Sequence, residues 1–127
     1  MSLNLNYSQT TGHVTSDDGT LITTGWSGHG DCKNDPTKED VVSTGPLPRG
    51  LYWVQPWEDL HPGLGPMVAY LKPDMINDMH GRGSFYIHGP AMDKAKYGQE
   101  SKGCIVIPRP GREAVKFLNP ATITVLE

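Results

Sequence analysis

The sequence predicts a mainly β fold, a sandwich or small barrel with one short helix. The chain holds 15 Gly and 11 Pro among 127 residues, well above their usual combined share of about 12%, which disfavours long helices. Short apolar runs rich in aromatic and β-branched residues recur between turn signals, as in an all-β domain. Only one segment near the carboxyl end has helical periodicity. At this length the chain is expected to form one domain with one core.

In the first half of the chain, short strands are predicted to be joined by turns. Residues 3–7 alternate apolar and polar side chains, which is typical of an edge strand. Residues 13–15 and 20–24 are predicted to form a hairpin, because Asp18-Gly19 supplies the positive φ that a tight turn needs. Residues 51–54 carry aromatic and branched side chains and are predicted to form the next strand. Segments rich in Gly, Pro or polar residues are expected to be loops: 26–30, 31–39 and 44–50.

In the second half, residues 56–66 are expected to form an irregular loop that holds Trp57 and His61. One helical turn is expected at 74–80. The helix is predicted at 111–118 and ends before Asn119-Pro120. Strands are predicted where apolar residues lie between turn signals: 67–71, 84–88, 104–107 and 121–126.

Composition and charge exclude several classes of function. The net charge is −3 and the pI is near 5.9, which argues against a nucleic-acid module, since such modules are usually basic. No stretch approaches the 18 apolar residues of a membrane span, so no membrane insertion is expected. The amino-terminal residues lack the charged and apolar regions of a signal peptide. Two cysteines allow one disulfide at most, and Cys32 is expected to be free.

One stretch of the sequence carries candidate chemistry. His88 closes one predicted strand and Cys104 opens the next, with 15 residues between them. Neighbouring strands would bring the two side chains together, and an imidazole can then take the proton of a nucleophilic thiol. Gly103 keeps the backbone beside the sulfur free of side-chain bulk, and its amide and that of Cys104 could face a developing oxyanion. Ser101 is positioned to hydrogen-bond across the loop.

Ordinary structural roles compete with this interpretation. A lone Cys is usually a small buried hydrophobe, and a lone His at a strand end is usually structural. His29 and Cys32 have a spacing compatible with zinc ligation, but no second closely spaced pair of ligands exists. A cell-wall-binding module could instead use Trp26 and Trp57 without any catalysis.

Four motifs in one order resemble the L,D-transpeptidase (YkuD-like) catalytic domain, in particular its small branch typified by type VI secretion L,D-transpeptidase effectors. The pattern His-Gly followed by Ser-x-Gly-Cys-Ile stands at residues 88–89 and 101–105. The other elements are Trp-Ser-Gly at 26–28 with Asn34 nearby, a Gly-Pro-rich turn at 45–52, and Gly81-Arg82 before the His strand. The resemblance spans about residues 20–125. A papain-like cysteine peptidase or amidase fits less well, because there the cysteine precedes the histidine.

The resemblance implies a single catalytic domain over residues 1–127 with an L,D-transpeptidase-like β-sandwich. It implies that Cys104 attacks the tetrapeptide stem of peptidoglycan at the bond between the third residue and the following D-alanine. Water, a free D-amino acid or a cross-linking amine would accept the acyl group. His88 would be the base, oriented by the carbonyl of Gly89, while Ser101 and the amides of Gly103 and Cys104 would support the oxyanion.

The resemblance also guides the search for substrate contacts. Many L,D-transpeptidases carry Arg two residues after the cysteine, where this chain has Val106. Arg82 is the preferred substitute, because Arg binds carboxylates in bidentate fashion, and Arg109 is expected to be a surface residue. His80 and the indoles of Trp26 and Trp57 are further candidates for substrate contact, whereas Trp53 is expected in the core.

No cofactor and no metal are expected. The expected partners are peptidoglycan stem peptides and, for an antibacterial effector, a cognate immunity protein; the chain itself is expected to be a monomer. Without a visible signal peptide, the protein is expected to be made in the cytoplasm. It would then reach the periplasm by a secretion machine or during phage lysis.

Overall fold

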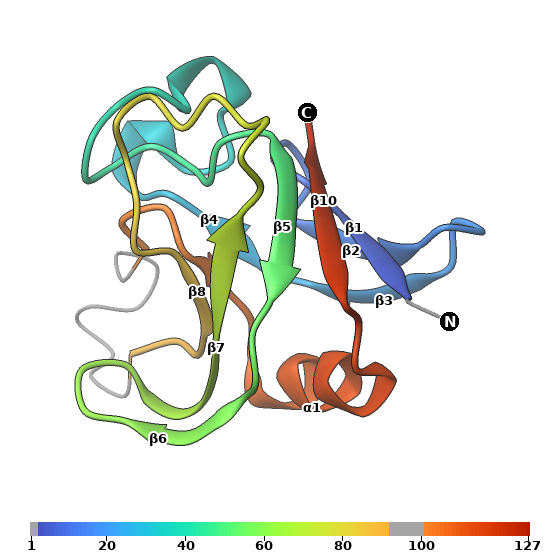
Figure 1. The fold of residues 1–127 in the computed structure, drawn as a ribbon. Coiled ribbons are helices and arrows are strands. Elements are labelled where there is room, and N and C mark those ends of the chain that lie inside the picture. Colours follow the sequence, from blue (N-terminus) through green and yellow to red (C-terminus); the bar gives the residue numbers. More distant parts are fainter. Residues whose placement is uncertain (1–2, 92–100) are drawn as a thin grey trace.

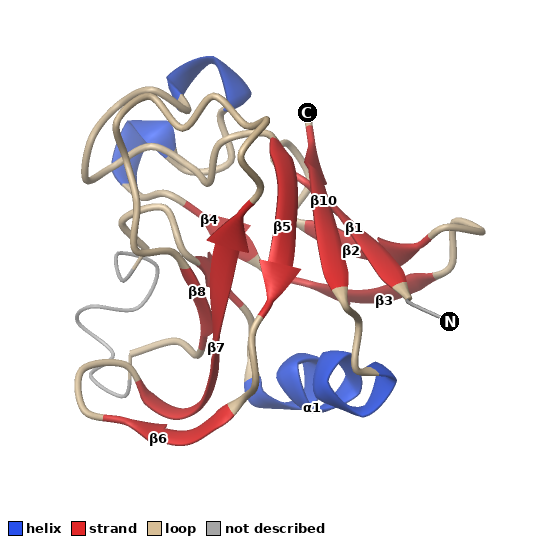
Figure 2. Ribbon diagram, in the orientation of Figure 1, coloured by secondary structure: helices blue, strands red, loops and turns tan. Residues whose placement is uncertain are grey.

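The computed structural model describes residues 3–91 and 101–127, which form ten strands and one α-helix (Figures 1 and 2). The strands are β1 (Asn4–Ser8), β2 (His13–Ser16), β3 (Leu21–Thr24), β4 (Trp26–Ser27), β5 (Gly50–Val54), β6 (Glu58–His61), β7 (Gly65–Pro73), β8 (Tyr86–His88), β9 (Ile105–Val106) and β10 (Thr122–Leu126). The helix is α1 (Arg109–Leu118), and two 3-10 turns precede β5: η1 (Gly30–Cys32) and η2 (Pro36–Lys38). The predicted mainly β fold class is confirmed.

The strands pair in the order β3-β2-β1-β10-β5-β7-β8-β9-β4, and β6 pairs with β7 beside this path. β1–β10 and β8–β9 are parallel, and the other pairs are antiparallel. β3 and β4 stand at opposite ends of the order, yet only Gly25 separates them in the chain. The sheet therefore curls until its two ends approach, with β2, β3 and β4 behind β5 and β10 in Figure 1.

Close packing at Gly25 explains why this junction needs glycine. A Cβ there would lie 2.3 Å from the carbonyl oxygen of Val106 and 2.9 Å from a side-chain carbon of Ile107. Any side chain would therefore push β4 away from β9 and open the curled sheet.

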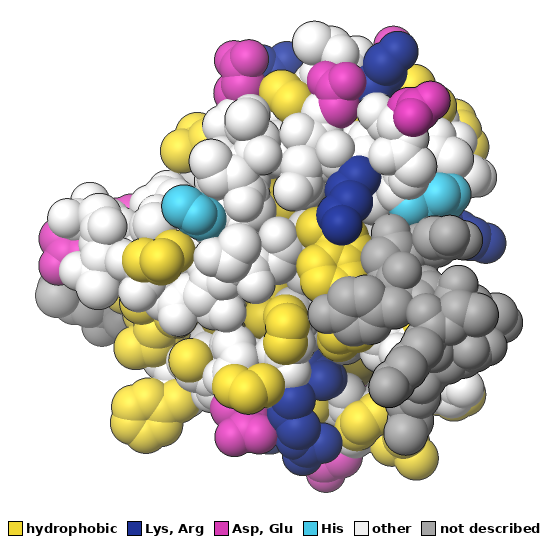
Figure 3. Space-filling view, turned by 180° about the vertical axis from the view of Figure 1, so that it is seen from behind, with side chains coloured by type: hydrophobic (Ala, Val, Ile, Leu, Met, Phe, Trp, Pro, Cys, Tyr) yellow, Lys and Arg dark blue, Asp and Glu magenta, His cyan; other side chains and the backbone are white. Residues whose placement is uncertain are grey.

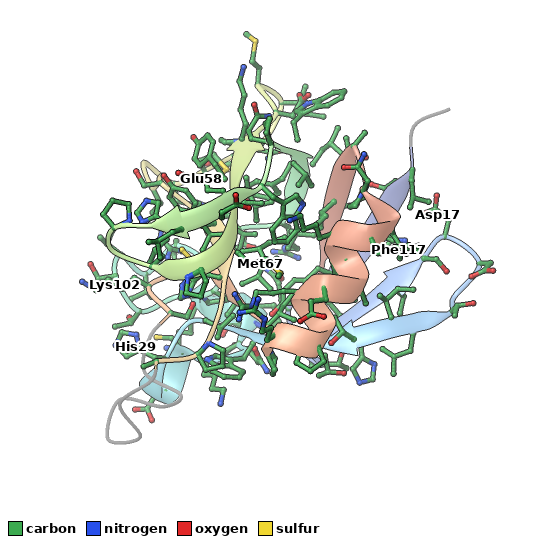
Figure 4. The ribbon with its side chains drawn as sticks, turned by 90° about the horizontal axis from the view of Figure 1, so that it is seen from below. Asp17, His29, Glu58, Met67, Lys102 and Phe117 are labelled. Atoms are coloured by element: carbon green, nitrogen blue, oxygen red, sulfur yellow. The ribbon has the colours of Figure 1, made fainter. Side chains whose placement is uncertain are left out.

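The core fills the inside of the curled sheet, and α1 covers one of its ends (Figure 1). α1 has Pro110 in its first turn and ends at Asn119, whose left-handed conformation lets its N–H bond the last carbonyls. Val115 is fully buried on the inner face of α1, whereas Phe117 points away from the protein (Figure 4). The core cluster contains Leu5, Tyr7, Val14, Leu47, Tyr52, Leu71, Phe85, Ile87, Ile105, Ile107, Val115, Ile123 and Val125.

Most predicted elements are present, including the first hairpin, the strand at 51–54 and the helix. Four expectations were wrong. Residues 26–30 were expected to form a loop, but Trp26–Ser27 form β4, which pairs with β9. β1 is no edge strand, because it pairs with both β2 and β10. Residues 56–66 contain β6 and the start of β7, which form a hairpin. Residues 74–80 form turns without a helical segment.

The burial of two tryptophans differs from the expectation: Trp53 was expected in the core, and Trp57 was expected to face substrate. Trp53 is 44% exposed, because the alternation of β5 points Tyr52 into the core and Trp53 outward, where its Nε1 donates to Asp74. Trp57 instead packs against the core cluster. Among the described residues, no helix has the length and apolar character needed to span a membrane.

Candidate active site

The parallel pair β8–β9 brings His88 and Cys104 to the same part of the sheet. Ile87 pairs with Ile105 and His88 with Val106, so Cys104, one residue before β9, stands beside Tyr86. The backbone N–H of Tyr86 donates to Cys104 Sγ over 3.3 Å. Because side chains alternate along a strand, positions 86 and 88 share a face. The Cys104 sulfur thus lies at the start of the strand that ends in His88.

His88 is buried, with 3% of its surface exposed, and a backbone carbonyl fixes its ring. Its Nδ1 lies 2.8 Å from the carbonyl oxygen of Gly89. A carbonyl can only accept, so Nδ1 carries the proton of this hydrogen bond. In the neutral ring Nε2 is then the basic nitrogen. The contact with Gly89 that the resemblance implies is present, and the role of His88 as base stays a prediction.

The hydroxyl of Ser101 organises the loop that leads to Cys104. Its Oγ donates to the carbonyl of Cys104 at 2.5 Å and accepts from the amides of Gly28 at 2.8 Å and Gly103 at 3.2 Å. These three bonds use the single donor and both acceptor sites of a hydroxyl. Ser101 and the Gly103 amide are therefore engaged with each other. The structure thus favours a positioning role for both over the predicted oxyanion contact.

The Trp-Ser-Gly motif at residues 26–28 holds the same loop from the other side. Ser27 Oγ donates to the carbonyl of Gly103 at 2.9 Å and accepts from the amide of Leu47 at 2.7 Å. Asn34 in turn accepts from the amide of Ser27. The motif therefore connects the Cys104 loop to the Gly-Pro-rich turn through hydrogen bonds that hold the backbone in place.

Arg82 clamps this turn to the Cys104 loop. Its Nη1 donates to the carbonyls of Glu39 and Pro46, and its Nη2 donates to the carbonyls of Gly45 at 3.0 Å and Lys102 at 3.1 Å. The guanidinium also lies 5.2 Å from the ring centroid of Phe85. The two terminal nitrogens that bidentate carboxylate binding would need are used by the backbone. Arg82 therefore acts as a positioning residue in this structure.

The environment of Cys104 holds two opposing influences on its proton. Burial raises the pKa of the thiol above its ordinary value, whereas the N–H of Tyr86, the charge of Arg82 and the Cys104 amide lower it. Burial dominates, so the group is a neutral thiol at pH 7. A base must then remove its proton as it reacts.

Gly103 is a position that only glycine fits. Its φ is +120°, and a Cβ would lie 2.3 Å from the ring of Phe85 and 2.7 Å from Nη2 of Arg82. The close approach of these two side chains fixes the backbone next to the sulfur.

Two cavities flank the pair of strands. One, of about 340 Å³, holds Cys104 together with Arg82, Phe85 and Lys102 in its lining. The other, of about 510 Å³, is lined by residues 63–66 and 88–91 with Arg109 and Arg112. Figure 3 shows one face of the molecule, where Lys and Arg side chains lie beside hydrophobic ones near the middle and Asp and Glu lie mainly toward the margins.

The remaining predicted contact residues lie elsewhere. Trp26 is 8% exposed, and Lys33 Nζ lies 4.9 Å from its ring centroid. Trp57 is partly buried and packs against the core cluster. His80 Nε2 lies 3.2 Å from Glu39 Oε2. The roles of these three residues in substrate contact stay predictions.

The residues weighed for zinc also have other contacts. His29 Nδ1 lies 2.7 Å from the carbonyl of Ser101. Cys32 is free, as expected, and Thr44 Oγ1 donates to its sulfur at 3.4 Å. Within residues 3–91 and 101–127, no three His, Cys, Asp or Glu side chains are grouped as metal ligands.

Arg112 is the site residue that sequence reasoning missed. It is 5% exposed, and it lines the cavity that contains His88. A helical spacing of three places it on the same face of α1 as the buried Val115. Burying an arginine on the inner face of a helix costs free energy unless its guanidinium binds a partner. The helical pattern of residues 111–118 could therefore have marked Arg112 as a candidate site residue.

Comparisons with known proteins give consistent matches. The sequence model of the Tlde1 domain matches residues 22–122. An L,D-transpeptidase from Mycobacterium smegmatis is similar in structure, with a TM-score of 0.55 and 16% identity over 99% of this chain and 59% of that one. An L,D-transpeptidase from Mycobacterium tuberculosis H37Rv gives 0.56, with 16% identity over 99% and 58%.

A third structure, Bd1075 of Bdellovibrio bacteriovorus, gives a TM-score of 0.61 with 15% identity over 98% of this chain and 48% of that one. This chain therefore spans less than two thirds of each of these proteins. At such identities the likeness concerns the fold. A search of curated protein sequences gives no match.

Proposed function

The chain belongs to the Tlde1 domain family, and from this premise we propose that it is a cysteine-dependent L,D-transpeptidase or L,D-carboxypeptidase acting on peptidoglycan. The substrate is the tetrapeptide stem, and the bond broken joins its third residue to the terminal D-alanine. The single observation that carries the proposal is the register of β8 and β9, which sets Cys104 beside the strand that ends in the oriented ring of His88.

The first half-reaction forms an acyl-enzyme. Cys104 Sγ attacks the carbonyl carbon of the third stem residue, and Nε2 of His88 takes the thiol proton as the S–C bond forms. Proton removal during attack is required because burial keeps the Cys104 pKa above its ordinary value. The tetrahedral intermediate then collapses, the C–N bond breaks, and His88 returns the proton to the amine of the leaving D-alanine.

The second half-reaction releases the thioester. An amine or a water molecule attacks the acyl carbon, His88 takes the proton of this nucleophile, and the C–S bond breaks with return of that proton to Cys104. An amine of another stem gives a cross-link, a free D-amino acid gives exchange, and water gives a shortened tripeptide stem. One protein can carry out all three, because they share every step up to the acyl-enzyme.

Mass spectrometry of purified tetrapeptide muropeptides tests the reaction. Incubation with the protein, with and without a free D-amino acid, is expected to give loss of D-alanine, exchange or a dimer. Cys104→Ala is expected to abolish all three, while Cys32→Ala, the matched control, keeps them. Unchanged muropeptides with a folded wild-type protein would refute the proposal and favour a binding module.

We also propose that the protein acts in the periplasm as an antibacterial effector or a phage protein, because its substrate lies there. A host that directs the chain to its periplasm is expected to lose viability, whereas cytoplasmic production or the Cys104→Ala variant leaves growth normal. Toxicity that is equal in both compartments would argue against this site of action.

A further inference from the structure

Arg112 is held so that one side of its guanidinium faces the cavity of His88. Its Nε donates to the carbonyl of Ile107 at 2.9 Å, and its Nη1 donates to the carbonyls of Pro66 at 2.6 Å and Met67 at 3.0 Å. Met67 belongs to β7, and Figure 4 shows it on the side of the β6–β7 hairpin that faces α1. These bonds use three of the five N–H groups of the side chain. In the described part of the chain, both N–H groups of Nη2 are left without an acceptor.

Nη2 lies directly against Gly89, the residue that orients the catalytic imidazole. A Cβ on Gly89 would lie 2.5 Å from Nη2 and 2.7 Å from the guanidinium carbon. The cavity lined by Arg112, Arg109, His88 and Gly89 therefore presents a fixed hydrogen-bond donor one residue from the base.

The cavity is positively charged. Its described lining contains two arginines and no acidic side chain. Arg109 forms an exposed ion pair with Glu113 at 3.1 Å. Arg112 has no carboxylate within ion-pair distance among the described residues, which is unusual for a charge that is 95% buried. A buried, oriented and unneutralised guanidinium is suited to an anionic ligand, above all a carboxylate.

We propose that Arg112 binds the α-carboxylate of the terminal D-amino acid, both as it leaves the donor stem and as it enters as a free acceptor. The inference rests on the proposed function and names the group that is recognised. The amine of this amino acid is the atom with which His88 exchanges a proton, and its carboxylate is one carbon away. Because Arg112 lies against Gly89 and lines the same cavity as His88, it is placed to bind the carboxylate when the amine meets the imidazole.

The experiment compares two substrates that differ only at this group: a tetrapeptide stem ending in D-alanine and the same stem ending in D-alaninamide. For the wild type, we expect kcat/KM to be roughly 10- to 150-fold lower on the amide, the range that a charged hydrogen bond supplies. Arg112→Lys is expected to lower kcat/KM on the acid by a similar factor and to discriminate little between the substrates. D-alanine and D-alaninamide as acceptors should show the same pattern.

A second variant keeps the inference testable if Arg112→Lys fails to fold, since Arg112 also holds Pro66 and Met67. Arg109→Glu places a negative charge at the exposed side of the cavity and is expected to raise KM for the acid at least fivefold, with little effect on the amide. Lys116→Glu, an equal change of charge on the exposed face of α1, is the matched control and leaves both values unchanged.

The outcomes separate the two proposals. Equal turnover of acid and amide by the wild type, or full discrimination by a folded Arg112→Lys, would overturn the role of Arg112 and leave the L,D-transpeptidase activity standing. If the folded wild type releases neither D-alanine nor D-alaninamide, the proposed activity itself is refuted.

Discussion

Ser101 and Cys104 are joined by a hydrogen bond from the serine hydroxyl to the cysteine carbonyl, 2.5 Å long and fully buried. The same hydroxyl accepts from the amides of Gly28 and Gly103. One side chain thus fixes three backbone groups within a single loop. These bonds fix the backbone on both sides of the sulfur just before β9 begins.

Ser101→Ala is expected to destabilise the protein by about 2–4 kcal/mol, because each buried polar group left unpaired costs about 1–3 kcal/mol. Activity should fall with it, since the loop is no longer fixed. Urea unfolding measures the change. Ser8→Ala is the control: it removes a hydroxyl whose two hydrogen bonds, to the carbonyl of Glu127 and from the amide of Thr11, are solvent-exposed, and it should stay within about 0.5 kcal/mol. Equal effects of the two variants would contradict the role given to Ser101.

The Cys104 thiol is expected to react slowly with iodoacetamide at pH 7 in the absence of substrate. Burial raises its pKa above the ordinary 9.0, so the alkylation rate should reach its half-maximum above pH 9.0. The measurement uses Cys32→Ala, in which Cys104 is the remaining cysteine. A half-maximum below pH 7 would show a preformed thiolate–imidazolium pair and contradict proton removal during attack.

Gly103→Ala is expected to lower stability by about 2–4 kcal/mol and to reduce turnover strongly, because the new Cβ strains the backbone and displaces Phe85 and Arg82. Gly83→Ala is a close control, since its Cβ would meet nothing within 4 Å and its φ is not positive. Thermal unfolding and D-alanine release from the same preparations check both effects. A Gly103→Ala protein as stable and active as Gly83→Ala would disprove the packing argument.

Glu39 is expected to make the free energy of unfolding decrease at acid pH. Burial raises its pKa, but hydrogen bonds from Gln9, Arg49 and His80 outweigh this and lower the value from 4.5 to about 2. A depressed pKa means that its contribution is complete above pH 4.5 and is lost as pH falls toward 2. Urea unfolding between pH 7 and 2 should show this loss in the wild type.

Glu39→Gln removes the carboxylate that makes this difference. Its unfolding free energy should be lower than that of the wild type at pH 7 and should vary less between pH 4.5 and 2. Glu58→Gln, on the exposed β6 (Figure 4), is expected to keep the wild-type stability at pH 7. If the unfolding free energies of wild type and Glu39→Gln fall in parallel between pH 4.5 and 2, another group causes the loss of stability in acid.

Sequence reasoning predicted elements that depend on short-range signals. The turn at Asp18-Gly19 and the helical period near residues 111–118 act within a few residues, and both predictions were confirmed. The neighbouring placement of His88 and Cys104 followed from one short connection between two strands. Errors arose where the place of a strand in the sheet depends on pairing with a distant segment. β1 is an example, because it lies between β2 and β10.

The chemical use of polar side chains was harder to predict, because it depends on the backbone groups that surround them. Arg82 was expected to face substrate, yet four carbonyls from two loops surround its terminal nitrogens. Arg112 was overlooked because its partners come from β7, more than forty residues earlier in the chain. No local pattern carries such contacts, although burial on the inner face of α1 marks Arg112 as unusual.

The position of β10 also governs the order in which the protein can fold. β10 is the final strand, yet it lies between β1 and β5 in the middle of the sheet and pairs with both. Until it docks, the β1–β3 unit shares no strand pairing with β5, and the register Asn4↔Thr122 must close a loop that spans most of the chain. Docking of β10 is thus a late step in the assembly of this sheet, and the apolar faces of β1 and β5 stay partly exposed until residues 122–126 have been synthesised.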